Sequence, residues 1–174
     1  MRKKALMSVI DFLVAAVLLA VDQLTKYWAV VRLKGEPAIV LIRDALELSY
    51  LENRGSAFGM LQNQKFFLLF VGCVFLLLIL FFLFKLPTEK KFIPTHICLA
   101  AVVAGGIGNM IDRLRFDYVV DFISFVLIHF PVFNFADCCI VVAVAGLFIL
   151  FLFVYQETDL EFLSFKQNKY RKLK

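Results

Sequence analysis

Four long apolar stretches alternate with shorter polar connections along this 174-residue chain. They cover approximately residues 6–31, 66–86, 92–112 and 136–155. Roughly 20 apolar residues in a helix cross the hydrocarbon core of a bilayer, so each stretch is long enough to span it. The pattern therefore predicts an all-α polytopic membrane protein with four transmembrane helices, forming a single integral-membrane domain over residues 1–174.

The connection between the first two apolar stretches follows a different pattern. Pro37 ends any helix, and residues 39–42 then form a short apolar run. Residues 46–51 alternate apolar and polar side chains with a period of two, which is typical of a strand with one apolar face. These segments predict a small amphipathic β-like platform on the membrane surface. Residues 115–135 are too short and too interrupted for a span, so we expect them to lie in or on the interface.

Composition and charge support the membrane interpretation and give it an orientation. Hydrophobic residues make up 62% of the chain, and a mean hydropathy of +0.86 argues against a soluble globular protein. The net charge of +5 does not form the compact basic face that nucleic acid requires, so no nucleic-acid partner is expected. Basic residues instead gather at both chain ends and in one loop, which predicts cytoplasmic termini and an extracytoplasmic platform. These residues are Arg2, Lys3, Lys4, Lys85, Lys90, Lys91, Lys166, Lys169, Arg171, Lys172 and Lys174.

The four cysteines and two histidines give no indication of a metal site. None of them shows the paired spacing of a zinc or iron–sulfur site, and the adjacent Cys138 and Cys139 suit free buried thiols better than a disulfide. The chain also lacks a P-loop. We therefore expect no metal ion and no cofactor.

Polar side chains gather where the apolar stretches end. In the predicted topology Asn53, Arg113, Asp121 and Asp137 all lie at the outer membrane surface. Ionisable residues are costly to hold at the margin of hydrocarbon, which makes them candidates for a functional site. Asp137 also has a purely structural explanation, because Asn134 is a natural N-cap and an acid in the first turn complements the helix dipole.

A pair of opposite charges lies within the first apolar stretch. Asp22 and Lys26 are four residues apart, so they share one face of a helix. We expect a structural ion pair that stabilises the outer end of the first helix.

Asp121 and Asp137 suggest a chemistry if the fold brings them together. Two carboxylates within a few ångströms share a proton, because both cannot easily ionise. The ionised member can then take a proton from water while the protonated member polarises a carbonyl, which hydrolyses a peptide without metal or covalent intermediate. A proton-coupled small membrane transporter using the same acids remains an alternative, although its acids would lie near the midplane. A purely structural acid pair is a third possibility.

Five segments of the chain resemble those of the bacterial lipoprotein signal peptidases, also called type II signal peptidases. No single segment is specific, but all five occur in the family's order and spacing between Asp22 and Asp137. They are Asp22-Gln23-Leu24-Thr25-Lys26, Glu52-Asn53-Arg54-Gly55-Ser56-Ala57-Phe58-Gly59, Gly105-Gly106-Ile107-Gly108-Asn109-Met110-Ile111-Asp112-Arg113, Val119-Val120-Asp121-Phe122 and Phe133-Asn134-Phe135-Ala136-Asp137.

The resemblance implies an aspartic endopeptidase of the bacterial cytoplasmic membrane. Such an enzyme cuts diacylglyceryl-modified prolipoproteins before the lipidated cysteine, and its partners are these substrates, membrane lipids and globomycin-like inhibitors. By resemblance, Asp121 and Asp137 are the catalytic pair. The residues implied to line the site and hold the substrate are Asn53, Asn109, Arg113 and Asn134, together with the small residues Gly55, Ala57, Gly108 and Ala136.

One position departs from the family pattern. Members often have Gly where Asp117 stands, four residues before Asp121. Asp112 and Asp117 are further acids near the motifs, and we expect both to be surface or scaffold charges rather than catalytic groups.

Overall fold

The computed structural model describes residues 2–55 and 60–163. Within these residues, four helices are long and apolar enough to cross a membrane. They are α1 (Arg2–Leu33), α2 (Lys65–Lys85), α3 (Ile93–Phe116) and α4 (Phe135–Ile149), and the last continues as a π-helical segment, η4, over Leu150–Val154. Short 3₁₀ segments occur at η2 (Lys90–Phe92), η3 (Val126–Ile128) and η5 (Glu157–Leu163). The predicted four-helix membrane architecture is confirmed.

The helix ends differ most from the predicted spans where charged residues extend the helix. α1 begins at Arg2 instead of near residue 6, and α3 continues to Phe116 instead of ending near residue 112. Both extensions lie beyond the apolar run. Hydropathy therefore locates the span but not the polar turns that continue it.

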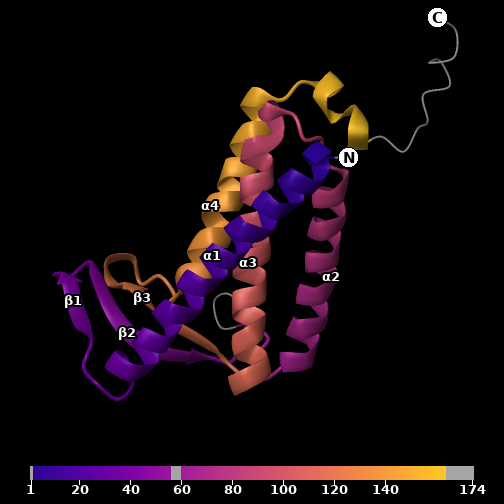
Figure 1. Ribbon diagram of the computed structural model, residues 1–174. Helices are drawn as coiled ribbons and strands as arrows, with labels where there is room; N and C mark the ends of the chain where they lie inside the picture. The colour runs from indigo at the N-terminus through magenta and orange to yellow at the C-terminus, as the bar shows by residue number, and fades with distance from the viewer. Residues whose placement is uncertain (1, 56–59, 164–174) are drawn as a thin grey trace, which may run out of the picture.

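The central helix of the bundle is α3. It packs against α1, α2 and α4, and Figure 1 shows α1 crossing the bundle obliquely in front of it. The strands lie at one end of the bundle, which we call the platform end. At the opposite end α1 begins and η4 finishes, and we call it the terminal end (Figure 1).

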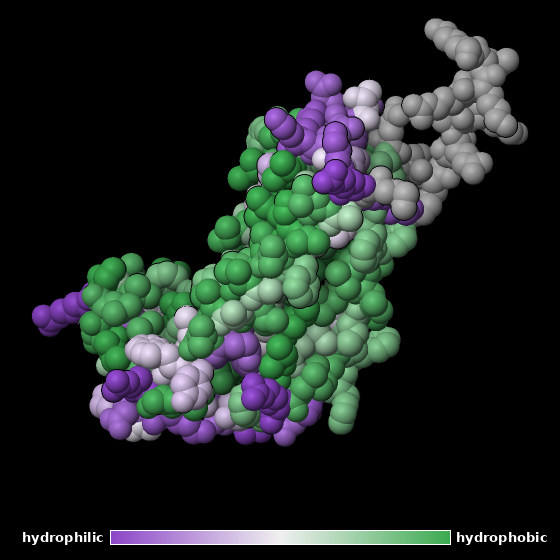
Figure 2. Space-filling view, viewed as in Figure 1, coloured by the Kyte–Doolittle hydropathy of each residue, from purple (hydrophilic) through white to green (hydrophobic). Residues whose placement is uncertain are grey.

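The bundle exposes an apolar surface of the kind that lipid covers. No residue of α2 is buried, although nearly all of its 21 residues are apolar. Figure 2 shows hydrophobic residues over the helices and hydrophilic ones concentrated at the two ends. At a rise of 1.5 Å per residue, α2 is about 32 Å long, close to the thickness of the hydrocarbon core. The chain is a multi-pass membrane protein.

The platform is an antiparallel sheet with the strand order β1-β2-β3. Its strands are β1 (Ile39–Ile42), β2 (Leu46–Asn53) and β3 (Val119–Phe125). The first two confirm the predicted strands, and β2 runs two residues beyond the alternating pattern of residues 46–51, to Asn53. The third strand is a correction, because residues 115–135 were predicted only as an interfacial segment.

The sheet is fixed to the bundle through β3. Val120 and Phe122 of β3 form a buried apolar cluster with Ala29 and Leu33 near the end of α1. In the β2–β3 ladder, Leu51 lies opposite Asp121. The end of β2 and the middle of β3 are thereby held at the point where α3 and α4 meet the platform.

Candidate functional site

Asp121 and Asp137 meet at the platform end of the bundle, and we call them the aspartate pair. Asp121 lies in β3 and is only 1% exposed, whereas Asp137 is half-buried in the first turn of α4. The pair is connected by shared side-chain partners. Residues sixteen positions apart, on a strand and a helix, thus belong to one hydrogen-bonded site.

Asn134 binds both members of the pair. Its side chain caps α4 by accepting a hydrogen bond from the Asp137 backbone N–H (3.1 Å), and its own N–H donates to Asp137 Oδ2 (3.1 Å). The Asn134 Nδ2 amide then donates to Asp121 Oδ1 (2.6 Å). The predicted helix cap is confirmed, and the same side chain extends from the cap to the second acid.

Each aspartate also receives an amide of its own. Asn53 Nδ2 donates to Asp121 Oδ2 and Asn109 Nδ2 donates to Asp137 Oδ1, both at 2.8 Å. Asn109 Oδ1 in turn accepts from Asn134 Nδ2 at 3.1 Å. Three amides from β2, α3 and the α4 cap therefore fix the orientation of both carboxyl groups.

Arg113 joins α3 to the segment that follows β2. Its Nη2 donates to the Gly55 carbonyl oxygen (2.8 Å) and its Nη1 donates to the Asn109 carbonyl oxygen (3.2 Å). The Gly55 N–H donates to Asn53 Oδ1 (3.0 Å), which settles the orientation of the Asn53 amide. Arg113 thus holds the chain beside the aspartate pair, while Ala57, another predicted site residue, lies outside the described residues.

A buried ionic cluster lies against the aspartate pair. Lys26 Nζ lies 3.0 Å from Asp22 Oδ2 and 3.1 Å from Asp112 Oδ2, and all three side chains are at most 4% exposed. The predicted Asp22–Lys26 ion pair is confirmed. Asp112 is a scaffold charge, as expected, but it is buried and does not lie at the surface. Gln23 Nε2 donates to both carboxylates, at 3.1 Å for Asp22 and 3.2 Å for Asp112.

The ionic cluster reaches the aspartate pair through three hydrogen bonds. Lys26 Nζ donates to Asn109 Oδ1 (2.8 Å), which leaves the Asn109 amide nitrogen directed at Asp137. Asp22 Oδ1 accepts from the Ala136 N–H (3.0 Å) and Asp112 Oδ2 accepts from the Val120 N–H (3.1 Å). The cluster therefore positions an amide partner and the chain beside both aspartates.

Gly108 and Ala136 are enclosed by protein. A Cβ on Gly108 would collide with the Asp22 carboxylate and lie 3.5 Å from the Ala136 Cβ, and Ala136 is fully buried. The resemblance implies that both residues line the site and help to hold the substrate. Their small size also lets α3 and α4 close around Asp22.

Burial changes the acidity of Asp121. Loss of solvent raises the pKa of its carboxyl group from 3.8 to about 7, and the charge of Asp137 adds to the rise. The hydrogen bonds from Asn53 and Asn134 oppose it, because they stabilise the ionised form. Near neutral pH, Asp121 therefore exchanges a proton in the range where a general acid is effective.

Asp117 lies apart from this site. It ends α3 in the left-handed conformation, with φ at 67°, and its carboxylate pairs with Lys65 Nζ at 2.5 Å. A positive φ is the conformation that glycine adopts most readily, so Asp117 occupies a position that favours glycine. As expected, Asp117 is a surface charge. Its hydrogen bond with Lys65 holds the pKa of the Asp117 carboxyl group below its ordinary value.

Sequence reasoning missed the contributions of Gln23 and the buried placement of Asp112. A signal was present, since both lie in motif segments where polar residues interrupt an apolar stretch. Among residues 2–55 and 60–163, no group of three or more His, Cys, Asp or Glu side chains is arranged to hold a metal ion. What the described side chains offer is a pair of carboxyl groups with different burial and fixed orientation.

Comparison with known proteins gives a consistent result. Residues 14–153 match the family model described as signal peptidase (SPase) II. The lipoprotein signal peptidase of Clostridium tetani is 42% identical over 80% of this chain and 88% of that protein, and the one of Brevibacillus brevis is 41% identical over 82% and 94%. A solved bacterial membrane enzyme superposes with a TM-score of 0.70 at 26% identity, covering 82% of this chain and 87% of that one.

Proposed function

Because this chain belongs to the signal peptidase II family, we propose that it removes signal peptides from diacylglyceryl-modified prolipoproteins. The cut falls before the lipidated cysteine, and Asp121 and Asp137 activate the attacking water as an aspartic endopeptidase. The observation that carries the proposal is the amide-linked aspartate pair at the platform end, with one member buried and one half-buried.

The two carboxyl groups have different roles in this mechanism. Asp121 carries the shared proton, because its pKa of about 7 keeps it partly protonated at neutral pH. It donates this proton to the oxygen of the scissile carbonyl, while Asp137 takes a proton from the water that attacks the carbonyl carbon. When the tetrahedral intermediate collapses, Asp137 returns its proton to the leaving nitrogen and a hydroxyl proton restores Asp121.

The side-chain amides of three asparagines hold both carboxyl groups of the pair in a fixed orientation. Asn53 and Asn134 each occupy one oxygen of Asp121, and Asn109 occupies one oxygen of Asp137. Each carboxyl oxygen keeps a second lone pair for water, substrate or the shared proton. Fixed donors of this kind hold the reacting groups in place without reorganisation during the step.

The platform places this chemistry at the membrane surface. All four side chains of β1 are exposed and apolar, so the strand can rest on lipid beside a substrate whose diacylglyceryl group stays in the bilayer. Positive charge at the terminal end supports an extracytoplasmic site in the bacterial cytoplasmic membrane. Gly55 and Ala57 would admit the lipidated peptide, and globomycin-like peptides would compete for the same space.

The proposal is tested with purified protein in lipid and a synthetic prolipoprotein peptide. We expect cleavage of the diacylglyceryl-modified peptide directly before the modified cysteine, seen by mass spectrometry of both products. The same peptide without the lipid is the control and should be cut far more slowly. Equal cleavage of both peptides, or a cut elsewhere, would contradict the proposed substrate class.

A further inference from the structure

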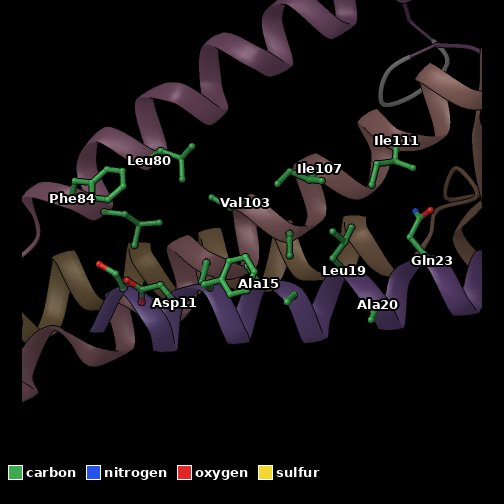
Figure 3. Close-up of a pocket in the computed structure, with 16 residues that line it drawn as sticks. Asp11, Ala15, Leu19, Ala20, Gln23, Leu80, Phe84, Val103, Ile107 and Ile111 are labelled. Atoms are coloured by element: carbon green, nitrogen blue, oxygen red, sulfur yellow. The ribbon is translucent and has the colours of Figure 1, made fainter. Parts of the chain in front are cut away.

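An apolar groove of about 620 Å³ lies between α1, α2 and α3. Figure 3 shows the side chains of α1 and α2 on opposite sides of it, with α3 between them. Neither member of the aspartate pair lines the groove, nor do Asn53, Asn109 or Asn134. The groove therefore does not include the aspartate pair, although Gln23, which donates to Asp22 and Asp112, lies at its platform end.

The groove is long and narrow. On α1 its lining runs from Ser8 to Gln23, which is about 22 Å along a helix axis. The walls along this length are almost wholly apolar, so an extended hydrocarbon chain suits them.

A second cavity, whose walls are partly polar and partly apolar, continues the groove at the terminal end. It measures about 160 Å³, shares Ser8, Leu83 and Phe84 with the groove, and adds Lys4 and Thr88. The groove passes from hydrocarbon-like walls to a basic and hydroxylated mouth. This change along its length is the chemistry of a phospholipid.

Lys4 brings a positive charge to the mouth. Asp11 also lines this end, but its Oδ2 lies 2.9 Å from His96 Nδ1, and His96 Nε2 faces the Pro87 carbonyl oxygen at 3.3 Å. The acid is therefore already engaged by a buried histidine. Within residues 2–55 and 60–163, Lys4 forms no ion pair, so its charge is available to a phosphate group.

We propose that the groove binds one anionic phospholipid from the leaflet at the terminal end. One acyl chain lies along α1, α2 and α3, and the phosphate sits at Lys4 and Thr88. This lipid fills the space between α1 and α2 and stabilises the folded bundle, because a ligand that binds only the folded state raises its stability by mass action. The inference goes beyond peptide cleavage and does not depend on it.

The test uses delipidated full-length protein in an uncharged detergent. Phosphatidylglycerol or phosphatidylcholine with identical acyl chains is added, and bound lipid is counted by native mass spectrometry alongside the thermal unfolding midpoint. We expect one retained phosphatidylglycerol, a rising midpoint, and about fivefold weaker binding of phosphatidylcholine, since one lysine near an anionic lipid contributes about 1 kcal/mol.

Two matched pairs of variants locate the lipid. Ala16→Leu fills the groove and should abolish retention, whereas Val17→Leu, on an exposed neighbouring position that does not line the groove, should not. Lys4→Gln should remove the preference for phosphatidylglycerol, and Lys3→Gln should keep it. Lys4 lies at the exposed start of α1, so its variant stays informative even if Ala16→Leu folds poorly.

Any of four results would overturn the proposal. Phosphatidylglycerol retained by Ala16→Leu as by wild type would place the lipid elsewhere on the bundle. If Lys4→Gln and Lys3→Gln showed the same preference for phosphatidylglycerol, the proposed headgroup site would be wrong. The same would follow if wild type bound the two lipids equally. Displacement of the lipid by a signal-sequence peptide would assign the groove to the substrate.

Discussion

At the scale of single residues, Asn134 shows why structural and functional explanations of a side chain are not exclusive. It is the N-cap of α4, which is enough to explain an amide at this position. The same amide donates to Asp121 Oδ1 and so connects the cap to the second acid. The sequence supports the cap from local spacing alone, but the contact with β3 depends on the fold.

Contacts between charged residues also differ in whether local sequence spacing predicts them. The Asp22–Lys26 pair is predictable because four residues make one helical turn. Its third member, Asp112, is 86 positions further along than Lys26, and nothing local in the sequence indicates that the two meet. The same holds for Asp11 and His96, which the sequence leaves isolated and the fold pairs at 2.9 Å.

Asn53 offers a direct test of what sets the acidity of Asp121. Its hydrogen bond stabilises the ionised carboxylate, so Asn53→Ala raises the pKa of Asp121 further above about 7. In the proposed mechanism activity needs the protonated form and falls as pH rises through this pKa. We therefore expect the alkaline limb of kcat to move to higher pH in this variant, measured as initial rates across pH 5–10.

Glu52→Gln is the matched control for that experiment. Glu52 neighbours Asn53 in β2, but its carboxylate contacts Lys34 and Arg54 and not Asp121. Its alkaline limb should coincide with that of wild type. If the alkaline limb of kcat in Asn53→Ala stayed in place or moved to lower pH, Asp121 would not be the group that controls this limb.

Lys26→Met tests the buried ionic cluster. Removing the lysine leaves two buried carboxylates without their counter-charge and frees the Asn109 oxygen, and breaking a buried pair in this way costs about 3–5 kcal/mol. We expect a large drop in the thermal unfolding midpoint. Lys34→Met, which breaks an exposed pair with Glu52, should change it little. Similar midpoints for the two variants would contradict the structural role given to the cluster.

At the scale of elements, the strands differ in how clearly the sequence pattern predicts them. Residues 46–51 alternate because one face of β2 is apolar and the other polar. In contrast, β3 is buried along its first four residues, so it has no alternation and reads as an apolar run interrupted by Asp121. Its pairing with β2 across 68 positions brings Asp121 to Asn53, and this partnership is not encoded locally.

The glycines of α3 differ in whether the contact between α3 and α4 requires them. A Cβ on Gly105 would lie 2.5 Å from the Ala136 carbonyl oxygen, and backbone cannot give way cheaply. On Gly106 it would meet only the end of the flexible Leu76 side chain, at 3.1 Å. The close approach of α3 and α4 therefore depends on Gly105.

This difference predicts unequal effects of the same substitution. Gly105→Ala pushes α4 away from α3 and disturbs the Asn109–Asp137 hydrogen bond, and misplacement by about 1 Å costs on the order of 10²-fold in rate. Gly106→Ala should retain most of its activity. Both are compared by kcat on the lipidated peptide, and comparable activities would show that the helix contact does not set the geometry of the site.

At the scale of the whole molecule, the four apolar stretches already identify the four membrane-spanning helices. Hydropathy alone locates the spans because a bilayer admits few folds other than helices of this length. It does not show that α3 is central, or that the platform rests on the end of α1 through Val120 and Phe122. Those features follow from packing between residues distant in the sequence.

Orientation is a prediction at this scale, and labelling with a membrane-impermeant maleimide checks it. In a variant lacking the native cysteines, Arg43→Cys places a thiol in the turn between β1 and β2, and Glu89→Cys places one between α2 and α3. In intact cells we expect Arg43→Cys to be labelled and Glu89→Cys to react only after permeabilisation. The reverse pattern would place the aspartate pair on the cytoplasmic side.

The most direct test of the whole account is cleavage by aspartate variants. Wild type, Asp121→Asn and Asp137→Asn are compared on the diacylglyceryl-modified peptide, with thermal unfolding as the check on folding and Asp117→Asn as an exposed control. We predict that wild type and Asp117→Asn cleave before the lipidated cysteine, and that both variants of the aspartate pair are folded but inactive. Full activity in either Asp121→Asn or Asp137→Asn would contradict the proposed mechanism.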